Sequence, residues 1–414
     1  MLNTSLIELP KLLTTTQRAA RTIAFKCLYQ LQVGSLTIIE SFPTVSERNH
    51  ERFGSSKDDG PVATIEVKHP DFYKRLLKGG SIAAGEAYMD GWWESPDLTA
   101  LMHLMALNLS ALDSIESNGS FVTQFLNKAK HFLNRNTVKQ SAENIHAHYD
   151  LGNDLYTSFL DENMLYSSGV FKSQSDTLEQ AQLNKMERLC QQLCLTKTDH
   201  VIEIGTGWGA MAIYMAKHYG CKVTTTTISD EQYDYTAKRV QQEGLGEQIT
   251  LLKQDYRLLE GEFDKLVSIE MIEAVGKAFL PSYIKKCQSL LKPKGLMAIQ
   301  AITIADQRYD SYSNNVDFIQ KYIFPGGFLP SITSLTKATT QHSDLVMRDL
   351  FDIGIDYAKT LNIWHQRFNR AESHVRELGY DERFIRMWRY YFSYCEGGFL
   401  AKSISTVHAT FQRP

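Results

Sequence analysis

The most constraining feature of this sequence is a regular alternation of strand-like and helix-like segments. Apolar, β-branched runs at 200–207 and 222–229 alternate with amphipathic helical stretches at 209–220 and 230–244. Such alternation is typical of a parallel sheet, because parallel neighbours need a long crossover that is usually a helix. The other expected strands are 248–256, 263–271 and 296–304, with a helix over 280–295. We therefore predict an α/β fold with a doubly wound, mostly parallel sheet.

A glycine-rich loop, "VIEIGTGWG", follows the first of these strands. Gly205, Gly207 and Gly209 permit a tight turn and a close approach of the backbone to a ligand at the carboxyl end of the strand. Such a loop binds a dinucleotide, S-adenosylmethionine or nothing. The spacing is not the GxGxxG of dinucleotide sites, and "TTTTIS", about twenty positions on, has no carboxylate. Gln254 and Asp255 are candidates for binding an adenine edge, which favours S-adenosylmethionine.

The 414 residues are enough for more than one domain. Residues 1–118 mix short strand-like runs with predicted helices, and we expect a smaller α+β domain there. Residues 119–140 form a basic connector, and residues 141–414 contain the alternating region. We therefore predict a larger α/β domain at 141–414, preceded by the smaller domain at 1–118 and the connector.

Composition excludes several classes of protein. The net charge of −3 argues against nucleic-acid binding. The six cysteines are scattered without a CxxC pair, which fits a reducing compartment and predicts no metal site. No stretch approaches twenty apolar residues, so no segment is expected to span a bilayer. A cytoplasmic protein, free or resting on a membrane surface, is the expectation.

An ordered set of motifs resembles the cyclopropane-fatty-acyl-phospholipid synthases and related lipid C-methyltransferases. The resemblance covers most of the chain, in the segments "LLKGGSIAAGEAYMDGWW", "HYDLGNDLY", "YSSGVF", "VIEIGTGWGA", "TISDEQ", "QDYR", "SIEMIEAVG", "YIFPGGFLPS", "GIDYAKTLNIWHQRF" and "YCEGGF". It implies a Rossmann-like fold of the class I methyltransferase type, with S-adenosylmethionine as cofactor. It also implies a substrate, the cis-unsaturated acyl chain of a phospholipid. For the domains, it implies catalysis at 141–414 and a role in lipid contact or dimer formation at 1–118.

The resemblance also implies which residues bind the cofactor. The methionine part is expected at Tyr166 and Ser167, and the backbone of the glycine loop at Gly205 and Gly207, beside Glu203, is expected to line the cofactor. The ribose region is expected at Thr227 and Gln232. The adenine is expected at Gln254, Asp255 and Tyr256. His148 and Tyr149 stand near the start of a helix that resembles the family's cover over the cofactor. A capped, buried turn is the alternative for these two residues.

Ring closure in this family needs a base, and the resemblance implies a bound bicarbonate held by a Cys, a Glu, a His, a Tyr and backbone amides. Glu273 and Tyr357 match the Glu and the Tyr. Ser168 stands at the Cys position and Gln300 at the His position, so a histidine that can carry charge near neutral pH is lost there. Glu396 is a further candidate base, with a structural, hydrogen-bonded carboxylate as the alternative.

The connector "FVTQFLNKAKHFLNRNTVK" bears phenylalanines at helical spacing and four basic residues elsewhere. This pattern is typical of a helix lying on an anionic membrane surface, or of an amphipathic linker packed on its own protein. With the resemblance, it predicts association with the inner face of the cytoplasmic membrane, unsaturated phospholipids as partners and a homodimer as the assembly.

The expected activity is therefore transfer of a methylene group from S-adenosylmethionine to an acyl double bond through a carbocation, giving a cyclopropane. The departures at Ser168 and Gln300 leave methylation without ring closure as the nearest rival activity. Methylation of a soluble small molecule is a further rival. A non-catalytic lipid- or cofactor-binding protein is the rival from outside the enzymes.

Overall fold

The computed structural model describes residues 13–42, 49–55, 60–109 and 152–414, which form two compact units. The N-terminal unit contains the described residues up to 109 together with Asp381–Ala401. The C-terminal unit contains the described residues from 152 to 380 together with Lys402–Pro414. The predicted connector at 119–140, and His148 and Tyr149, lie outside the described residues.

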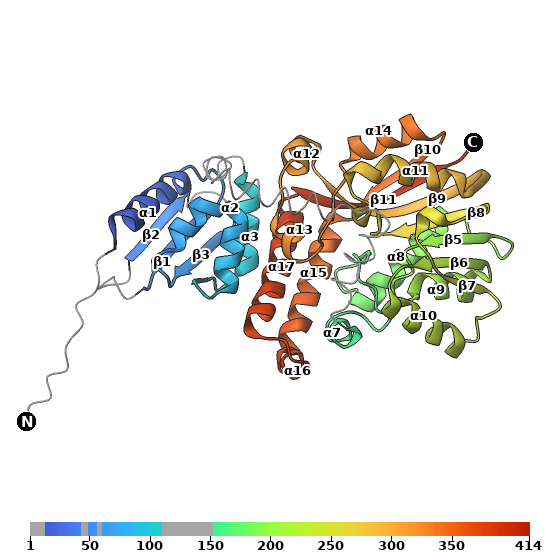
Figure 1. Ribbon diagram of the computed structural model, residues 1–414, viewed down its shortest axis with the longest axis horizontal. Helices are drawn as coiled ribbons and strands as arrows, with labels where there is room; N and C mark the ends of the chain where they lie inside the picture. The colour runs from blue at the N-terminus through green and yellow to red at the C-terminus, as the bar shows by residue number, and fades with distance from the viewer. Residues whose placement is uncertain (1–12, 43–48, 56–59, 110–151) are drawn as a thin grey trace, which may run out of the picture. The chain divides into compact units, whose positions relative to one another are not determined.

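The N-terminal unit is built on a four-stranded sheet in the order β2-β1-β3-β4, in which β1 and β3 are parallel. Its elements are α1 (Thr15–Leu28), β1 (Ser35–Glu40), β2 (Asn49–Gly54), β3 (Val62–Val67), α2 (Phe72–Met89), β4 (Trp93–Glu94), α3 (Leu98–Leu107) and α17 (Glu382–Leu400) (Figure 1). Helix α17 packs against α2 and α3. A Cβ at Gly397 would lie 2.6 Å from the backbone N of His103, so this close packing of helices requires glycine.

The C-terminal unit contains a seven-stranded sheet in the order β10-β11-β9-β8-β5-β6-β7. Its strands are β5 (His200–Ile204), β6 (Lys222–Thr227), β7 (Ile249–Lys253), β8 (Phe263–Ile269), β9 (Leu291–Ile304), β10 (Val346–Asp352) and β11 (Ile404–Gln412). Strands β5 to β9 are parallel, while β11 runs antiparallel between β9 and β10. The α/β fold with a mostly parallel sheet is as the alternation predicts.

Helices connect these strands. They are α7 (Asn153–Thr157), α8 (Leu178–Gln192), α9 (Ala210–Tyr219), α10 (Asp230–Gln242), α11 (Leu280–Ser289), α12 (Asp306–Ser313), α13 (Phe318–Tyr322), α14 (Ile332–His342), α15 (Gly354–Arg370) and α16 (Glu372–Glu377). Short 3₁₀ turns lie at η1 (Tyr256–Leu258), η2 (Ile272–Ala274) and η3 (Lys277–Phe279). The helix expected over 280–295 ends at Ser289, because β9 begins at Leu291 and continues through Pro293 and Gly295.

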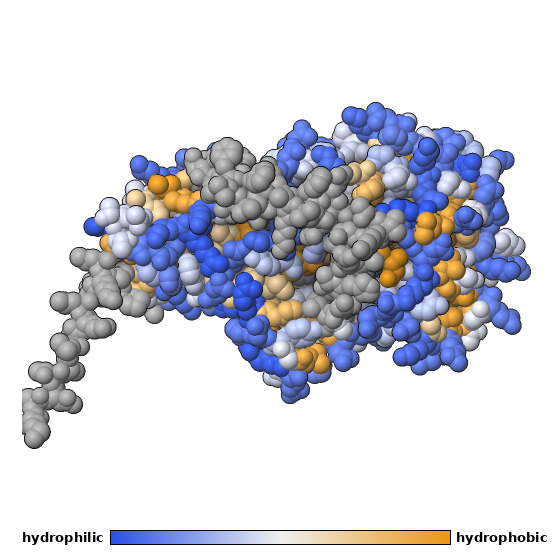
Figure 2. Space-filling model, viewed as in Figure 1, coloured by the Kyte–Doolittle hydropathy of each residue, from blue (hydrophilic) through white to orange (hydrophobic). Residues whose placement is uncertain are grey.

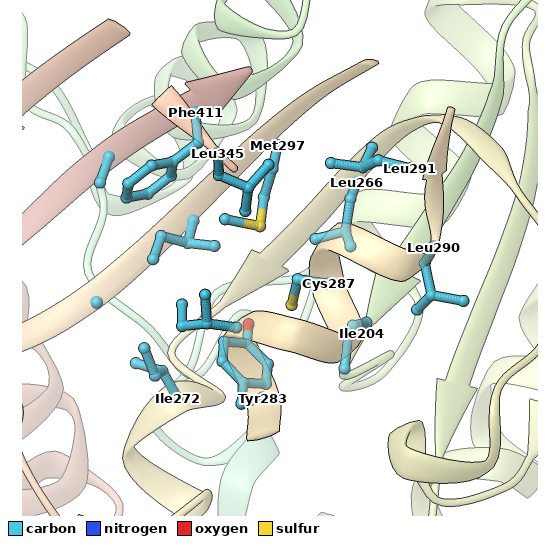
Figure 3. Close-up of a cluster of buried hydrophobic side chains, with 14 of the residues drawn as sticks. Ile204, Leu266, Ile272, Tyr283, Cys287, Leu290, Leu291, Met297, Leu345 and Phe411 are labelled. Carbon is cyan, nitrogen blue, oxygen red and sulfur yellow. The ribbon is translucent and has the colours of Figure 1, made fainter. Parts of the chain in front are cut away.

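Both faces of the large sheet are buried. Ile202, on one face of β5, belongs to a hydrophobic cluster with α11 and α14, whereas the adjacent Val201 belongs to a second cluster with α8 and α9. This alternation follows from the two-residue period of a strand. Figure 3 shows the first cluster, in which Ile272 and Tyr283 lie beside strand residues such as Ile204. Ile272 thereby fixes the η2 turn, which carries Glu273, onto the core.

On the face seen in Figure 2, hydrophilic residues predominate and hydrophobic residues lie between them. The exposed large hydrophobic residues include Val346, Leu350 and Phe351 of β10 and Ile355 of α15. Among the described residues, no helix combines the length and the apolar character that crossing a membrane requires.

Candidate active site

The glycine loop lies between β5 and α9, at the carboxyl edge of the parallel strands. Gly205 and Gly207 have φ values of +97° and +53°, which L side chains rarely adopt. A Cβ at Gly207 would meet no atom within 4 Å, whereas one at Gly205 would lie 3.3 Å from Cγ of Met271. The loop backbone is therefore open at Gly207, and at Gly205 it lies against the segment that follows β8.

Buried polar groups surround the base of this loop. The Thr225 hydroxyl donates to Oε2 of Glu203 at 2.5 Å and lies 2.6 Å from Oγ1 of Thr206. Burial raises the pKa of Glu203 to about 8, so this carboxyl holds a proton at neutral pH. The hydrogen-bond partner of the Glu203 carboxyl is therefore Thr225 of the neighbouring strand, at the base of the loop.

The next two strands end in further polar side chains. The buried Thr227 hydroxyl donates to Oε1 of Gln232 at 2.9 Å, which positions the amide at the start of α10. Oδ1 of Asp255 accepts hydrogen bonds from two atoms of Arg257, the backbone N at 2.9 Å and the side-chain Nε at 2.8 Å. Nε2 of Gln254 donates to the Leu258 carbonyl at 2.7 Å. These are polar residues at the edge where a nucleoside would lie in such a fold.

The segment "YSSGVF" runs past the same edge. The half-buried Tyr166 ring lies 5.3 Å from the rings of both Tyr156 and Trp364. The Ser167 hydroxyl accepts a bond from Nζ of Lys185 at 2.6 Å. Lys185 is fully buried, and burial lowers its pKa to about 8. The first serine thus has a cationic partner that the sequence prediction did not include.

Glu270 stands directly after β8, and three donors hold its carboxylate. The backbone N–H of Ser168 and Nε2 of Gln300 donate to Oε1 at 2.9 and 2.7 Å, and the hydroxyl of Tyr357 donates to Oε2 at 2.8 Å. We call these three donors the anion cradle. Glu270 has a φ of +46°, a conformation that costs a residue other than glycine about 1–3 kcal/mol. The surrounding fold therefore holds this carboxylate in the cradle against local backbone strain.

The environment of Glu270 raises the pKa of its carboxyl, although several groups oppose this shift. Its side chain is partly buried, and this burial raises its pKa above the ordinary value. The Ser168 N–H, the charge of Lys185, the Tyr357 hydroxyl and the Gln300 amide act in the opposite direction, because each favours the ionised form.

Gln300 is oriented by a residue on the neighbouring strand. His408 of β11 is its register partner, and Nε2 of His408 lies 2.9 Å from Oε1 of Gln300. Burial lowers the pKa of His408 to about 3, so the imidazole is neutral and donates from Nε2. The Gln300 oxygen accepts this bond, which leaves the amide nitrogen to donate to Glu270.

Glu273 lies three residues further on. Its Oε1 accepts a bond from the backbone N of Ile302, and its buried Oε2 has no hydrogen-bond partner among the described residues. Burial, and secondarily the charge of Glu270, raise the pKa of Glu273 to about 8. At neutral pH Glu273 is therefore a carboxylic acid.

Aromatic rings form one side of this region. Phe159 lies 6.1 Å from Trp364 and 6.3 Å from Phe368, and Phe324 lies 6.3 Å from Tyr166. Edge-to-face and tilted ring contacts of this kind give a rigid apolar wall.

Ser168, Gln300 and Tyr357 meet around Glu270. Glu396 lies on α17 of the N-terminal unit, where its Oε2 accepts a bond from Thr99 at 3.1 Å. The role of Glu396 as a base stays a prediction.

Sequence analysis did not identify three residues of this site, which are Glu270, Lys185 and His408. Glu270 carried a signal, because a carboxylate directly after a parallel strand points to the ligand-binding edge. Lys185 also carried one, since it stands on the apolar stripe of α8 with Leu178, Ala181, Met186 and Leu189. His408 carried none, because its role depends on the pairing of β11 with β9.

The site suits S-adenosylmethionine, because an open glycine loop, a polar edge and an aromatic wall lie around the carboxyl ends of the strands. A bicarbonate does not fit in the same way, because the Glu270 carboxylate already uses the donors implied for that anion.

Comparison with known proteins agrees with this geometry. Residues 136–409 match the family described as mycolic acid cyclopropane synthetase. The cyclopropane-fatty-acyl-phospholipid synthase of Escherichia coli K12 is 38% identical over 363 residues, which cover 87% of this chain and 91% of that protein. The tuberculostearic acid methyltransferase UfaA1 of Mycobacterium tuberculosis is 36% identical over 352 residues, covering 82% of this chain and 81% of that protein.

Solved structures show the same fold. The cyclopropane synthase MmaA2 of Mycobacterium tuberculosis superposes with a TM-score of 0.62 at 24% identity. The mycolic acid cyclopropane synthase CmaA1, complexed with SAH and CTAB, gives 0.61 at 25% identity. Each comparison covers 66% of this chain and 98% of the other. The chain therefore belongs to the mycolic acid cyclopropane synthetase family of S-adenosylmethionine-dependent methyltransferases, as its motifs predict.

Proposed function

We propose that this protein transfers a methylene group from S-adenosylmethionine to the cis double bond of a phospholipid acyl chain, forming a cyclopropane. One observation carries the proposal: the glycine loop at Gly205 lies against Met271, the residue that directly follows Glu270 in the chain. A methyl transfer followed by proton removal requires a cofactor loop and a base on adjoining segments, as this arrangement provides. The names of the relatives in Escherichia coli and Mycobacterium tuberculosis support a lipid substrate.

In this proposal, the cofactor site is formed by the residues assigned by resemblance. They are Tyr166, Ser167, Glu203, Gly205, Gly207, Thr227, Gln232, Gln254, Asp255 and Tyr256. Among them, Thr227 and Gln232 are already bonded to each other, which would present the Gln232 amide in a fixed orientation. Glu203 is assigned the role of supporting the loop through Thr225, since its carboxyl is bonded there.

When bound, S-adenosylmethionine supplies an activated methyl group. The chain's own residues must then position the double bond, exclude water and take up a proton. The rings of Tyr166, Phe324 and Trp364 are suited to the first two tasks. They can also attract positive charge on the acyl chain, with about 2 kcal/mol per desolvated cation–π contact. Ser168, Gln300, Tyr357 and Glu273 are assigned to the reacting end of the pocket.

A second candidate function is methylation without ring closure. The similarity to a tuberculostearic acid methyltransferase favours it, as do the departures at Ser168 and Gln300 from the residues that the resemblance implies. Both products begin with the same methyl transfer. Without ring closure, a hydride shifts to the cationic carbon and a proton is then lost, which leaves a methyl-branched or methylene chain with a double bond.

A phospholipid substrate implies work at a membrane surface. We propose that the protein is cytoplasmic, associates peripherally with the inner face of the membrane, and assembles as a homodimer. The basic, phenylalanine-bearing connector at 119–140 supports membrane contact. Flotation of the protein with anionic vesicles, and its sedimentation without them, would test these two points separately.

The activity itself is tested with purified protein, S-adenosylmethionine and vesicles of a monounsaturated phospholipid. Vesicles of the saturated phospholipid are the control. The proposal predicts methyl transfer to unsaturated chains alone, and a product that resists hydrogenation. A product with a reducible double bond would favour the second candidate. Cofactor binding without transfer would indicate a non-catalytic protein, and transfer only to a soluble acceptor would indicate a small-molecule methyltransferase.

A further inference from the structure

We propose that Glu270 is the base that removes the proton in ring closure, and that its carboxylate takes the place of a bound bicarbonate. The inference rests on the proposed function, because it assigns one step of that reaction.

The anion cradle is already occupied by a side chain of this protein. Ser168, Gln300 and Tyr357 occupy three of the positions that the resemblance implies for holding bicarbonate. In this structure all three donate to Glu270, at 2.9, 2.7 and 2.8 Å. A carboxylate and a bicarbonate present the same planar pair of oxygens, so one set of donors cannot hold both. The side chain of Glu270 therefore excludes the anion from the cradle.

The carboxylate is also fixed in direction. The neutral His408 holds the Gln300 amide so that its nitrogen faces Oε1 of Glu270. The Tyr357 hydroxyl holds the other oxygen. A base held from both oxygens, on a backbone with φ of +46°, is preorganised in the way that catalytic groups require.

The position of Glu270 in the fold suits proton removal from a substrate beside the cofactor. Glu270 immediately precedes Met271, which lies against Gly205 of the cofactor loop. Its side chain is only partly buried, so part of it remains accessible to a substrate. The buried Lys185 supplies a positive charge that favours its ionised form.

The proposed step balances as follows. After methyl transfer, the acyl chain carries a positive charge on the carbon next to the methylated one. A C–H bond of the added methyl group breaks, and its electron pair forms the third C–C bond of the ring. The proton passes to an oxygen of Glu270, and it is released to water after the product has left.

Two variants test the assignment. Glu270→Gln keeps the shape but cannot accept the proton, so turnover should fall by about 100-fold or more. Glu270→Gly removes the side chain and suits the positive φ, so it should be inactive alone and regain activity when bicarbonate or formate is added. Glu187→Gln is the matched control, since Glu187 also accepts bonds from tyrosine hydroxyls and a glutamine amide, away from the cluster.

The measurements are methyl transfer to unsaturated vesicles in buffer with and without bicarbonate, and affinity for S-adenosylhomocysteine as the check on folding. The proposal predicts a wild-type rate that does not depend on bicarbonate, and rescue of Glu270→Gly but not of Glu270→Gln. Bicarbonate-dependent wild-type turnover, full activity of Glu270→Gln, or no rescue of Glu270→Gly would overturn it. A wild-type protein that methylates no vesicle lipid would instead overturn the proposed function on which it rests.

Discussion

His408 and Gln300 are register partners on antiparallel strands, and Nε2 of the imidazole lies 2.9 Å from the Gln300 oxygen. A buried neutral histidine thereby sets the direction of an amide that binds Glu270. The resemblance implies a histidine at position 300 itself, so here the imidazole lies one residue further from the reacting centre.

Replacing His408 should impair turnover more than cofactor binding. His408→Phe leaves the Gln300 oxygen without its donor, at a cost of about 1–3 kcal/mol, or roughly 5- to 150-fold in kcat. Thr410→Val is the control, since it removes a bond to Gln192 from the same strand. Steady-state kinetics with unsaturated vesicles would measure both. Equal losses of kcat in the two variants would mean that turnover depends on the integrity of β11 and not on the orientation of Gln300.

The same residue should make stability depend on pH. The folded pKa of His408, about 3, lies below its ordinary value of 6.5, so the unfolded chain takes up a proton first on acidification. This contribution to stability is complete above pH 6.5 and is lost as the pH falls, at about 1.4 kcal/mol per pH unit. Urea unfolding at pH 6.5 and 5.5 should show a correspondingly smaller loss in His408→Phe than in the wild type. The same loss in both proteins would contradict the prediction.

The fold and the cofactor loop were predictable, because alternating strands and helices and the GxGxG loop depend on local sequence. The anion cradle was not, since Ser168, Gln300 and Tyr357 come from three distant segments that meet only in the folded sheet. The return of the chain to β11 after α17, which brings His408 beside Gln300, has no local signal. Glu270 and Lys185 did have local signals, and reading those signals would have placed both near the site.

Lys185 should tune the acid side of the pH–rate profile. Its charge lowers the pKa of Glu270, which burial has raised, so Lys185→Met should raise that pKa further. Because the base must be ionised, the acid limb of kcat should move to higher pH. Lys217→Met, which removes an exposed ion pair with Glu243, is the control. An unmoved acid limb in Lys185→Met would show that the lysine does not act on Glu270.

Tyr357 should support the same carboxylate. Tyr357→Phe removes one hydrogen bond to a charged group, worth about 1.5–3 kcal/mol, so kcat should fall about 10- to 100-fold. Tyr219→Phe is the matched control, because Tyr219 also donates to a carboxylate, that of Glu187. Both rates should be compared at saturating cofactor. A drop of the same size in Tyr219→Phe would indicate a general loss of stability.

The most direct measurement follows the transferred hydrogens. Purified protein is incubated with S-adenosylmethionine that carries a trideuterated methyl group and with monounsaturated phospholipid vesicles, and the acyl chains are analysed by mass spectrometry before and after hydrogenation. Removal of a proton from the added methyl by Glu270 predicts a product that retains two deuterium atoms and resists hydrogenation. Retention of all three deuterium atoms, with a double bond that hydrogenation removes, would contradict ring closure.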